Sequence, residues 1–136
     1  MIPASFKILG QDFKVVFDDE LCKKEGSYGM YFPSLNKIVL SKRFEENNET
    51  VNLDEDFIKH TFYHELIHAI LNVMQEKELY ENERFIDIFA GILLQIEKTS
   101  EYETDKSKRK PRTVDTGRTS SFKSVREIDK KTKKKG

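Results

Sequence analysis

The chain has 136 residues, of which 37% are hydrophobic, so it can form one modest core but not a large multidomain enzyme. The net charge is zero, but residues 1–100 carry 11 Lys and Arg against 18 Asp and Glu, whereas residues 101–136 carry 13 against 6. An acidic body with a charge of −7 therefore precedes a basic segment with a charge of +7. Cys22 is the only cysteine, which excludes an intrachain disulfide and a cysteine-based zinc site.

No targeting segment or membrane span is predicted. The first ten residues lack a basic region followed by an apolar run, and the chain has no stretch of about 18 uncharged apolar residues. We therefore expect a soluble, cytoplasmic protein without a membrane partner.

The first 40 residues predict a small antiparallel sheet. Gly10-Gln11-Asp12 is typical of a hairpin loop, and residues 33–36 favour a turn. Residues 45–50 are polar and predict a loop. The predicted strands, which are rich in β-branched and aromatic side chains, cover residues 6–9, 13–17, 28–32 and 37–40.

Two helices are predicted to follow the sheet. The first covers about residues 53–74, because Asn52 followed by Glu55 suggests a capping box. Its apolar side chains recur at helical spacing and predict a core-facing stripe, which leaves the histidines on another face. The second covers about residues 81–98 and is apolar enough to pack on both the sheet and the first helix. The elements predict an α+β fold in which a small antiparallel sheet packs on two helices.

The first predicted helix contains an H-E-x-x-H pattern formed by His64, Glu65 and His68. Residues four apart lie on the same helix face, so the two imidazoles can bind one metal ion. Glu65 lies about 100° round the helix from His64, where it can reach a water on that metal without binding the metal itself. His60 lies one turn earlier, too far to share the ion with both other histidines, and we expect it to be exposed or to line the cleft.

A catalytic zinc usually takes three protein ligands, so the two histidines need one more partner. Glu83 and Asp87 are four residues apart at the start of the second helix and face the same way. We expect Glu83 to be the third ligand and Asp87 to accept the free N–H of a zinc-bound histidine. Glu81 is the next candidate ligand, and it lacks an acidic residue four positions later. The alternative interpretation is that neither carboxylate takes part in a metal site, because acidic residues are favoured at a helix N-terminus in any case.

Residues 59–71 resemble the active-site helix of the small ImmA/IrrE-type metallopeptidases and related phage-encoded zinc peptidases. Those proteins typically have Thr three residues before the first histidine, here Thr61, and Ala after the second, here Ala69. Residues 83–90 resemble their second helix, with a ligand Glu, an acid or Asn four residues later, and then Phe-Ala. The resemblance implies a zincin-like fold of the gluzincin type, with Glu65 as the base and zinc held by His64, His68 and Glu83.

The resemblance is good over about residues 37–96 and covers the N-terminal sheet only in outline. Two residues depart from the ImmA/IrrE pattern: Ile86 stands where Ala is usual, and Ile67 stands where Gly is common. Both departures point toward the phage peptidase branch.

These residues predict a zinc-dependent metalloendopeptidase that hydrolyses peptide bonds in a protein substrate, with Glu65 as general base. A strand such as residues 37–40 could hold an extended substrate by β-addition, and the acidic body favours basic substrates. The sequence does not choose among four candidates for stabilising the oxyanion, which are Tyr28, Tyr31, Tyr63 and His60.

Two other functions are alternatives: a regulatory ImmA/IrrE-like protein that acts on or binds a single repressor partner, and a nucleic-acid-associated protein with a structural metal. Residues 101–136 contain too few large apolar residues to fold alone and predict a disordered tail after a metallopeptidase domain of residues 1–100. The tail charge predicts weak electrostatic contact with nucleic acid or an acidic partner. An amphipathic helix could form on a partner through Phe122, Val125 and Ile128.

Overall fold

The computed structural model describes residues 1–103, and Met1–Ser100 forms one folded unit. Most of the predicted basic tail, including Phe122, Val125 and Ile128, lies outside the described residues. The architecture is α+β, as the sequence predicts, and combines a small sheet, a separate hairpin and a set of helices.

Strands β1 (Ser5–Ile8) and β2 (Gln11–Phe17) form the predicted N-terminal hairpin. The loop is shorter than expected, because Leu9 and Gly10 alone connect the strands, with φ values of 49° and 84°. Positive φ at both positions is typical of a two-residue type I′ turn, and glycine adopts it without steric penalty. The hairpin places Phe13, which is fully buried, in the core.

The prediction of an antiparallel sheet is wrong for one strand pair. After β2 the chain forms α1 (Asp19–Glu25), which the sequence patterns do not predict, and then β3 (Gly29–Phe32) and β4 (Lys37–Leu40). The strand order is β1-β2-β4-β3, and β4 is antiparallel to β3 but parallel to β2. A parallel pair needs a long connection, which α1 and β3 supply. As a result β4 is internal and β3 is an edge strand.

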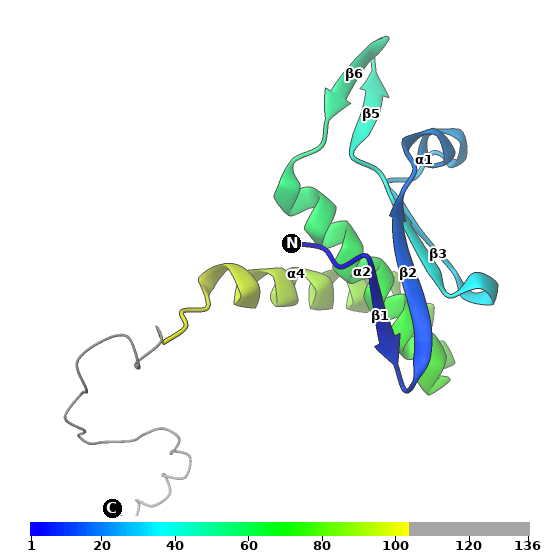
Figure 1. Cartoon of the computed structure of the whole chain (residues 1–136), viewed down its shortest axis with the longest axis vertical. Helices are drawn as coiled ribbons and strands as arrows, with labels where there is room; N and C mark the ends of the chain where they lie inside the picture. The colour runs from blue at the N-terminus through cyan, green and yellow to red at the C-terminus, as the bar shows by residue number, and fades with distance from the viewer. Residues whose placement is uncertain (104–136) are drawn as a thin grey trace, which may run out of the picture. The chain divides into compact units, whose positions relative to one another are not determined.

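Residues 45–50, predicted as a loop, belong to a second hairpin formed by β5 (Arg43–Glu46) and β6 (Glu49–Asn52). Its turn residues Asn47 and Asn48 have φ values of 54° and 64°. Asparagine tolerates this left-handed conformation better than most residues. The hairpin is largely exposed and polar, so it lacks the apolar alternation that predicts a strand. It extends away from the sheet (Figure 1).

Helix α2 (Glu55–Met74) carries the H-E-x-x-H pattern. Its N-cap is Asp54, whose carboxylate accepts a hydrogen bond from the backbone N–H of Asp56. The predicted capping box at Asn52 is wrong, because Asn52 is the last residue of β6. The helix ends at Gln75, which adopts the left-handed conformation.

Two helices follow, α3 (Lys77–Tyr80) and α4 (Glu83–Thr99). Helix α4 begins two residues later than the predicted start because Asn82 caps it, accepting a hydrogen bond from the backbone N–H of Phe85. Glu83 is therefore the first residue of α4, where the helix dipole favours a carboxylate.

Helix α2 packs on the sheet and on α4, which runs across it (Figure 1). A helix covered on two sides is apolar on more than one face, which explains why α2 shows more than the single stripe predicted. The cluster toward the sheet comprises Val15, Ile38, Leu40 and Phe62, and the cluster toward α4 comprises Ile67, Leu71, Ile86 and Ala90.

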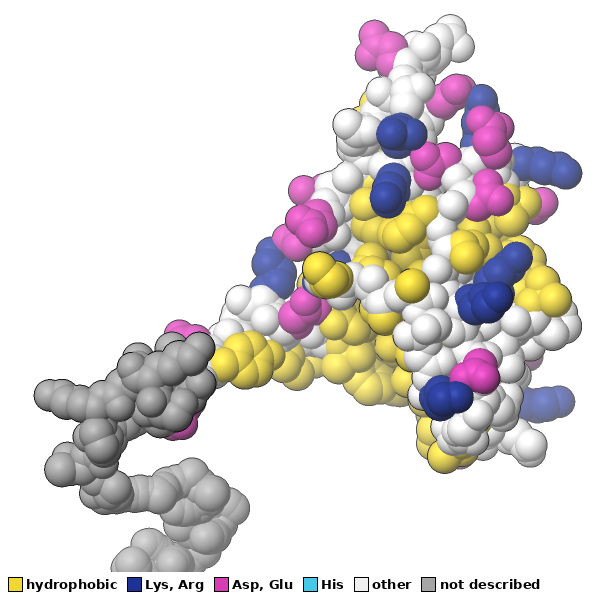
Figure 2. All heavy atoms as spheres, viewed as in Figure 1, with side chains coloured by type: hydrophobic (Ala, Val, Ile, Leu, Met, Phe, Trp, Pro, Cys, Tyr) yellow, Lys and Arg dark blue, Asp and Glu magenta, His cyan; other side chains and the backbone are white. Residues whose placement is uncertain are grey.

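The expectation that the second helix also packs on the sheet is wrong, because the extensive contacts of α4 are with α2 and α3. Apolar side chains of α4 therefore remain exposed, and Figure 2 shows hydrophobic side chains along this helix. No helix within residues 1–103 combines the length and apolarity needed to cross a membrane. The exposed apolar residues of α4, each at least 40% accessible, are Ile88, Phe89, Ile92 and Ile96.

Candidate metal centre

The two histidines of the H-E-x-x-H pattern lie one above the other on α2, with ring centroids 5.1 Å apart. The helical spacing alone produces this arrangement. The side chain of His64 is 20% exposed and that of His68 is 10% exposed. The expectation that both lie on a face away from the core is wrong for His68, which is buried beside α3.

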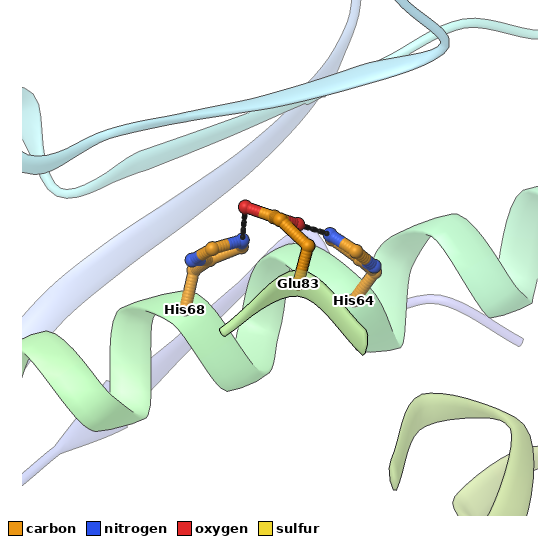
Figure 3. Close-up of side chains that lie close together, drawn as sticks. All are labelled: His64, His68 and Glu83. Carbon is orange, nitrogen blue, oxygen red and sulfur yellow. Dashed lines mark hydrogen bonds and ion pairs between the residues drawn. The ribbon is translucent and has the colours of Figure 1, made fainter. Parts of the chain in front are cut away.

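Glu83 lies between the two imidazoles, although it is 15 residues or more from either in the sequence. Its Oε1 is 2.9 Å from Nε2 of His64, and its Oε2 is 3.3 Å from Nε2 of His68 (Figure 3). One ligand atom from each of the three residues lies within 4.8 Å of the others. We refer to His64, His68 and Glu83 as the centre.

Asp87 lies one turn after Glu83 on α4 and contacts the other nitrogen of His64. Its Oδ1 is 3.3 Å from His64 Nδ1, so the ring faces a carboxylate on each side. His60 Nε2 lies 3.2 Å from the backbone carbonyl oxygen of Asp87, and His60 is half-buried rather than fully exposed. A carboxylate that accepts the Nδ1–H of a ligand histidine fixes its tautomer and its orientation.

Glu81, the alternative third ligand, is not among the groups that converge. It precedes α4, is exposed, and lines a separate cavity beside α3. The structure thus brings together His64, His68, Glu83 and Asp87 and leaves Glu81 outside.

Glu65 is positioned differently from the other carboxylates. Burial raises its pKa to about 7, an effect that His64 opposes and Glu83 reinforces. Strand β3 crosses close to it: a methyl group added at Gly29 would lie 3.5 Å from Glu65 Cγ and only 2.5 Å from Thr61 Cγ2. A carboxyl group with a pKa near neutrality is suited to general acid–base chemistry.

His68 is held by packing rather than by a second carboxylate. Its Nδ1 is buried and has no hydrogen-bond partner among residues 1–103. The ring of Tyr80, from α3, contacts it edge to face at 4.8 Å between centroids and an interplanar angle of 71°. Burial lowers the pKa of His68, against the opposing effect of the Glu83 carboxylate, so the neutral imidazole that metals bind is favoured.

Three of the four oxyanion candidates are engaged elsewhere. Tyr28 packs edge to face on Phe57, and Tyr63 donates a hydrogen bond of 2.5 Å to Glu97. His60 is bound to Asp87, as described above. Tyr31 lies over the C-terminal half of α2, where its hydroxyl accepts a hydrogen bond of 3.1 Å from Asn72.

Sequence reasoning missed Tyr80. Burial raises the pKa of its phenol, and Tyr31, Glu65 and Glu83 add to this effect, so Tyr80 lies near these three groups. No periodic pattern points to this residue, since α3 is only four residues long.

Residues 37–40 are not available to a peptide as predicted, because β4 is paired on both sides. Of the two edge strands, β1 and β3, it is β3 that packs against the helix carrying the histidines. In an antiparallel pair, alternate residues exchange hydrogen bonds with the neighbouring strand. The Ser41 N–H donates to the Tyr28 carbonyl oxygen at 3.1 Å, so Tyr28 and Met30 face β4. The N–H and C=O groups of Gly29 and Tyr31 therefore face the open edge.

At one of these two positions, Gly29, the backbone groups are already hydrogen-bonded to a side chain. The Ser27 hydroxyl donates to the Gly29 carbonyl oxygen at 2.6 Å and accepts from the Gly29 N–H at 3.3 Å. This leaves Tyr31 as the position on β3 where an added strand can pair.

Comparison of the chain with protein-family models, curated proteins and solved structures gave no significant match. Any function is therefore inferred from the geometry of the centre.

Proposed function

We propose that this protein is a zinc-dependent metalloendopeptidase, similar to the ImmA/IrrE-type and phage-encoded peptidases. In this proposal His64, His68 and Glu83 hold the zinc ion, Glu65 is the general base, and Asp87 orients His64. The observation that carries the proposal is the convergence of two imidazole Nε2 atoms on the two oxygens of one carboxylate. A set of two imidazoles and one carboxylate suits zinc and is typical of its catalytic sites.

The proposal assigns each side chain a step in peptide hydrolysis. When bound, zinc would supply a Lewis acid that acidifies water and polarises a carbonyl group. Glu65 takes a proton from the attacking water as the new C–O bond forms, and it delivers the proton to the leaving nitrogen as the C–N bond breaks. In the metal-free protein burial raises the pKa of Glu65 to about 7, and this environment suits a carboxyl group that accepts a proton and then delivers it.

The exposure of the centre argues against a structural metal, the basis of the nucleic-acid alternative. Structural zinc sites have four protein ligands and are closed, whereas catalytic sites keep one position open. Here only three ligand groups converge within residues 1–103, and the side chain of Glu83 is 66% exposed.

We propose that the substrate is an extended segment of another protein. Its backbone would pair with the N–H and C=O of Tyr31 at the open edge of β3, beside the helix that carries the centre. Residues 1–100 carry a net charge of −7, which favours a basic segment by long-range attraction.

The test is a comparison of Glu65→Gln with Glu81→Gln in the zinc-loaded full-length protein, using fluorescein-labelled casein as an unfolded substrate. We expect Glu65→Gln to retain zinc and to lose casein cleavage at least 100-fold, because a general base contributes about 10²- to 10⁴-fold. Glu81→Gln should cleave at the wild-type rate. Wild-type protein that holds zinc without cleaving casein would contradict the proposal. If it instead retained one repressor partner equally well with and without Glu65, the regulatory alternative would be favoured.

A further inference from the structure

Tyr80 covers one side of the centre. It is the last residue of α3, the short helix between the two helices that carry His68 and Glu83. Its ring lies edge to face on His68, with centroids 4.8 Å apart. The phenol is close enough to Glu65 and Glu83 for both carboxylates to act on it electrostatically.

The hydroxyl of Tyr80 has no hydrogen-bond partner among residues 1–103, although the residue is half-buried. The hydroxyl oxygen itself is not fully buried, because His68 Nδ1 is the one buried side-chain N or O atom of residues 1–103 that lacks a partner. Of the other half-buried tyrosines near α2, Tyr63 donates its hydroxyl proton to Glu97, whereas the Tyr31 hydroxyl accepts from Asn72 beyond the centre. The Tyr80 hydroxyl is therefore a free donor at the margin of the centre.

Tyr80 also lines a cavity of about 490 Å³, to which His68 does not contribute. Its lining includes Asn72, whose amide bonds to the Tyr31 hydroxyl on β3, the strand with the open edge. The Tyr31 phenol also acts electrostatically on Tyr80, so a peptide paired with β3 at Tyr31 would pass close to the Tyr80 hydroxyl.

We propose that Tyr80 is a further catalytic residue, whose O–H donates a hydrogen bond to the carbonyl oxygen of the scissile peptide bond as that oxygen gains negative charge. The inference rests on the proposed peptidase function. The phenol keeps its proton throughout, and Glu65 moves the proton of the attacking water to the leaving amine. A donor aimed at the developing charge stabilises the transition state more than the ground state.

The test uses the zinc-loaded full-length protein with Tyr80→Phe, which removes only the hydroxyl, and Tyr28→Phe as the matched control. Tyr28 packs on Phe44 and Phe57, away from the centre. Zinc content and the kcat and KM for labelled casein are measured for each protein. Calorimetry then gives the affinity for tri-alanine and for its phosphinic analogue, in which a charged tetrahedral group replaces the scissile peptide bond.

We expect Tyr80→Phe to keep its zinc and to lower kcat about 100-fold with little change in KM, as for loss of one oxyanion donor. The phosphinic analogue should bind at least about tenfold more weakly, whereas tri-alanine should bind as before, because only the analogue carries the charge that develops in the transition state. Tyr28→Phe should match the wild type.

Three results would overturn the inference alone, with casein cleavage by the wild type still supporting the peptidase. The first is wild-type kcat and analogue affinity in Tyr80→Phe. The second is a raised KM with unchanged kcat, which would make the ring a wall of the substrate site. The third is an equal loss in Tyr28→Phe. A zinc-loaded wild type that neither cleaves casein nor binds the analogue would overturn the proposed function and the role of Tyr80 together.

Discussion

Helices α2 and α4 meet at two polar clusters that use similar carboxylates for different purposes. One cluster, the clamp, joins Lys59 and Tyr63 of α2 to Glu97 of α4. Lys59 Nζ lies 2.6 Å from one oxygen of Glu97, and the Tyr63 hydroxyl donates to the other oxygen at 2.5 Å. The second cluster is the centre, where Glu83 of α4 faces the two histidines of α2.

The difference lies in where the positive charge comes from. At the clamp the chain supplies a lysine, so the carboxylate is neutralised and hydrogen-bonded within the protein. At the centre, no Lys or Arg of residues 1–103 forms an ion pair with Glu83 or Asp87, whose partners are imidazoles. A cluster completed by its own lysine joins two helices, whereas a cluster of imidazoles and carboxylates is suited to receive a cation from solution.

The largest expected effect is the loss of the metal from His64→Ala. Wild-type protein should hold about one zinc per chain, and His64→Ala should hold none after gel filtration, because one of three ligands is missing. Zinc at about 1,000 times its Kd should add about 4 kcal/mol to the free energy of unfolding of the wild type and nothing to that of the variant. Metal analysis and chemical denaturation measure the two effects. Zinc retained at the wild-type level in His64→Ala would show that the centre does not bind the metal, so that it would not differ from the clamp in this respect.

Glu83→Gln should weaken zinc binding by more than the 10- to 100-fold that a supporting residue is worth, because it removes the charged ligand. Glu81→Gln is the control and should bind zinc as the wild type does, since Glu81 is not among the converging groups. Competition with a zinc chelator measures both affinities. A larger effect from Glu81→Gln would reassign the third ligand.

The two clusters should also differ in their response to pH when metal is absent. Glu65, beside the centre, has a pKa of about 7 in the folded state, against an ordinary value of 4.5. The folded state then binds the proton more tightly than the unfolded state, so metal-free stability falls as pH rises from about 4.5 to 7. The shift corresponds to about 3 kcal/mol, and it should vanish in Glu65→Gln.

Denaturation of the metal-free protein between pH 4.5 and 8 measures this dependence. His64 and Glu83 also face Glu65, and the lowered pKa of His68 acts in the opposite direction. These groups are common to both proteins, so the difference between wild type and Glu65→Gln isolates Glu65. An equal slope in the two proteins would show that Glu65 ionises normally.

Asp87→Ala should reduce zinc affinity about 10- to 100-fold while leaving the three ligands in place, because the Nδ1 of His64 loses its carboxylate partner. Asp87→Asn should lose less, since the amide oxygen can still accept the Nδ1–H. If Asp87→Ala bound zinc as tightly as the wild type, the contact between Asp87 and His64 would have no part in binding.

The smallest expected effect is at the clamp. Glu97→Gln should lower the free energy of unfolding by about 1 kcal/mol, because the pair is partly exposed and solvent screens it. Its zinc affinity should equal that of the wild type. Loss of zinc from Glu97→Gln would show that the clamp positions α4, and with it Glu83, for the centre.

Prediction of the fold succeeded where the pattern is periodic and failed where it is not. Helices α2 and α4 and the first hairpin follow from spacing and turn residues. Helix α1 was missed although Asp18 caps its start and Gly26 ends it, because seven residues are too few for a clear apolar stripe. The antiparallel sheet was wrong because strand order depends on where β4 inserts, and no local pattern encodes that position.

The features of the site also fall into two groups, those set by spacing in the sequence and those set by tertiary structure. The sequence alone determined that His64 and His68 share a face with Glu65 beside them, since this follows from 3.6 residues per turn. It also favoured Glu83 over Glu81 through the spacing to Asp87. The meeting of Glu83 with the histidines, the burial that raises the pKa of Glu65 and the contact of Tyr80 with His68 were decided by tertiary structure. These features depend on how α3 and α4 cross α2, and that crossing is set by packing between residues far apart in the chain.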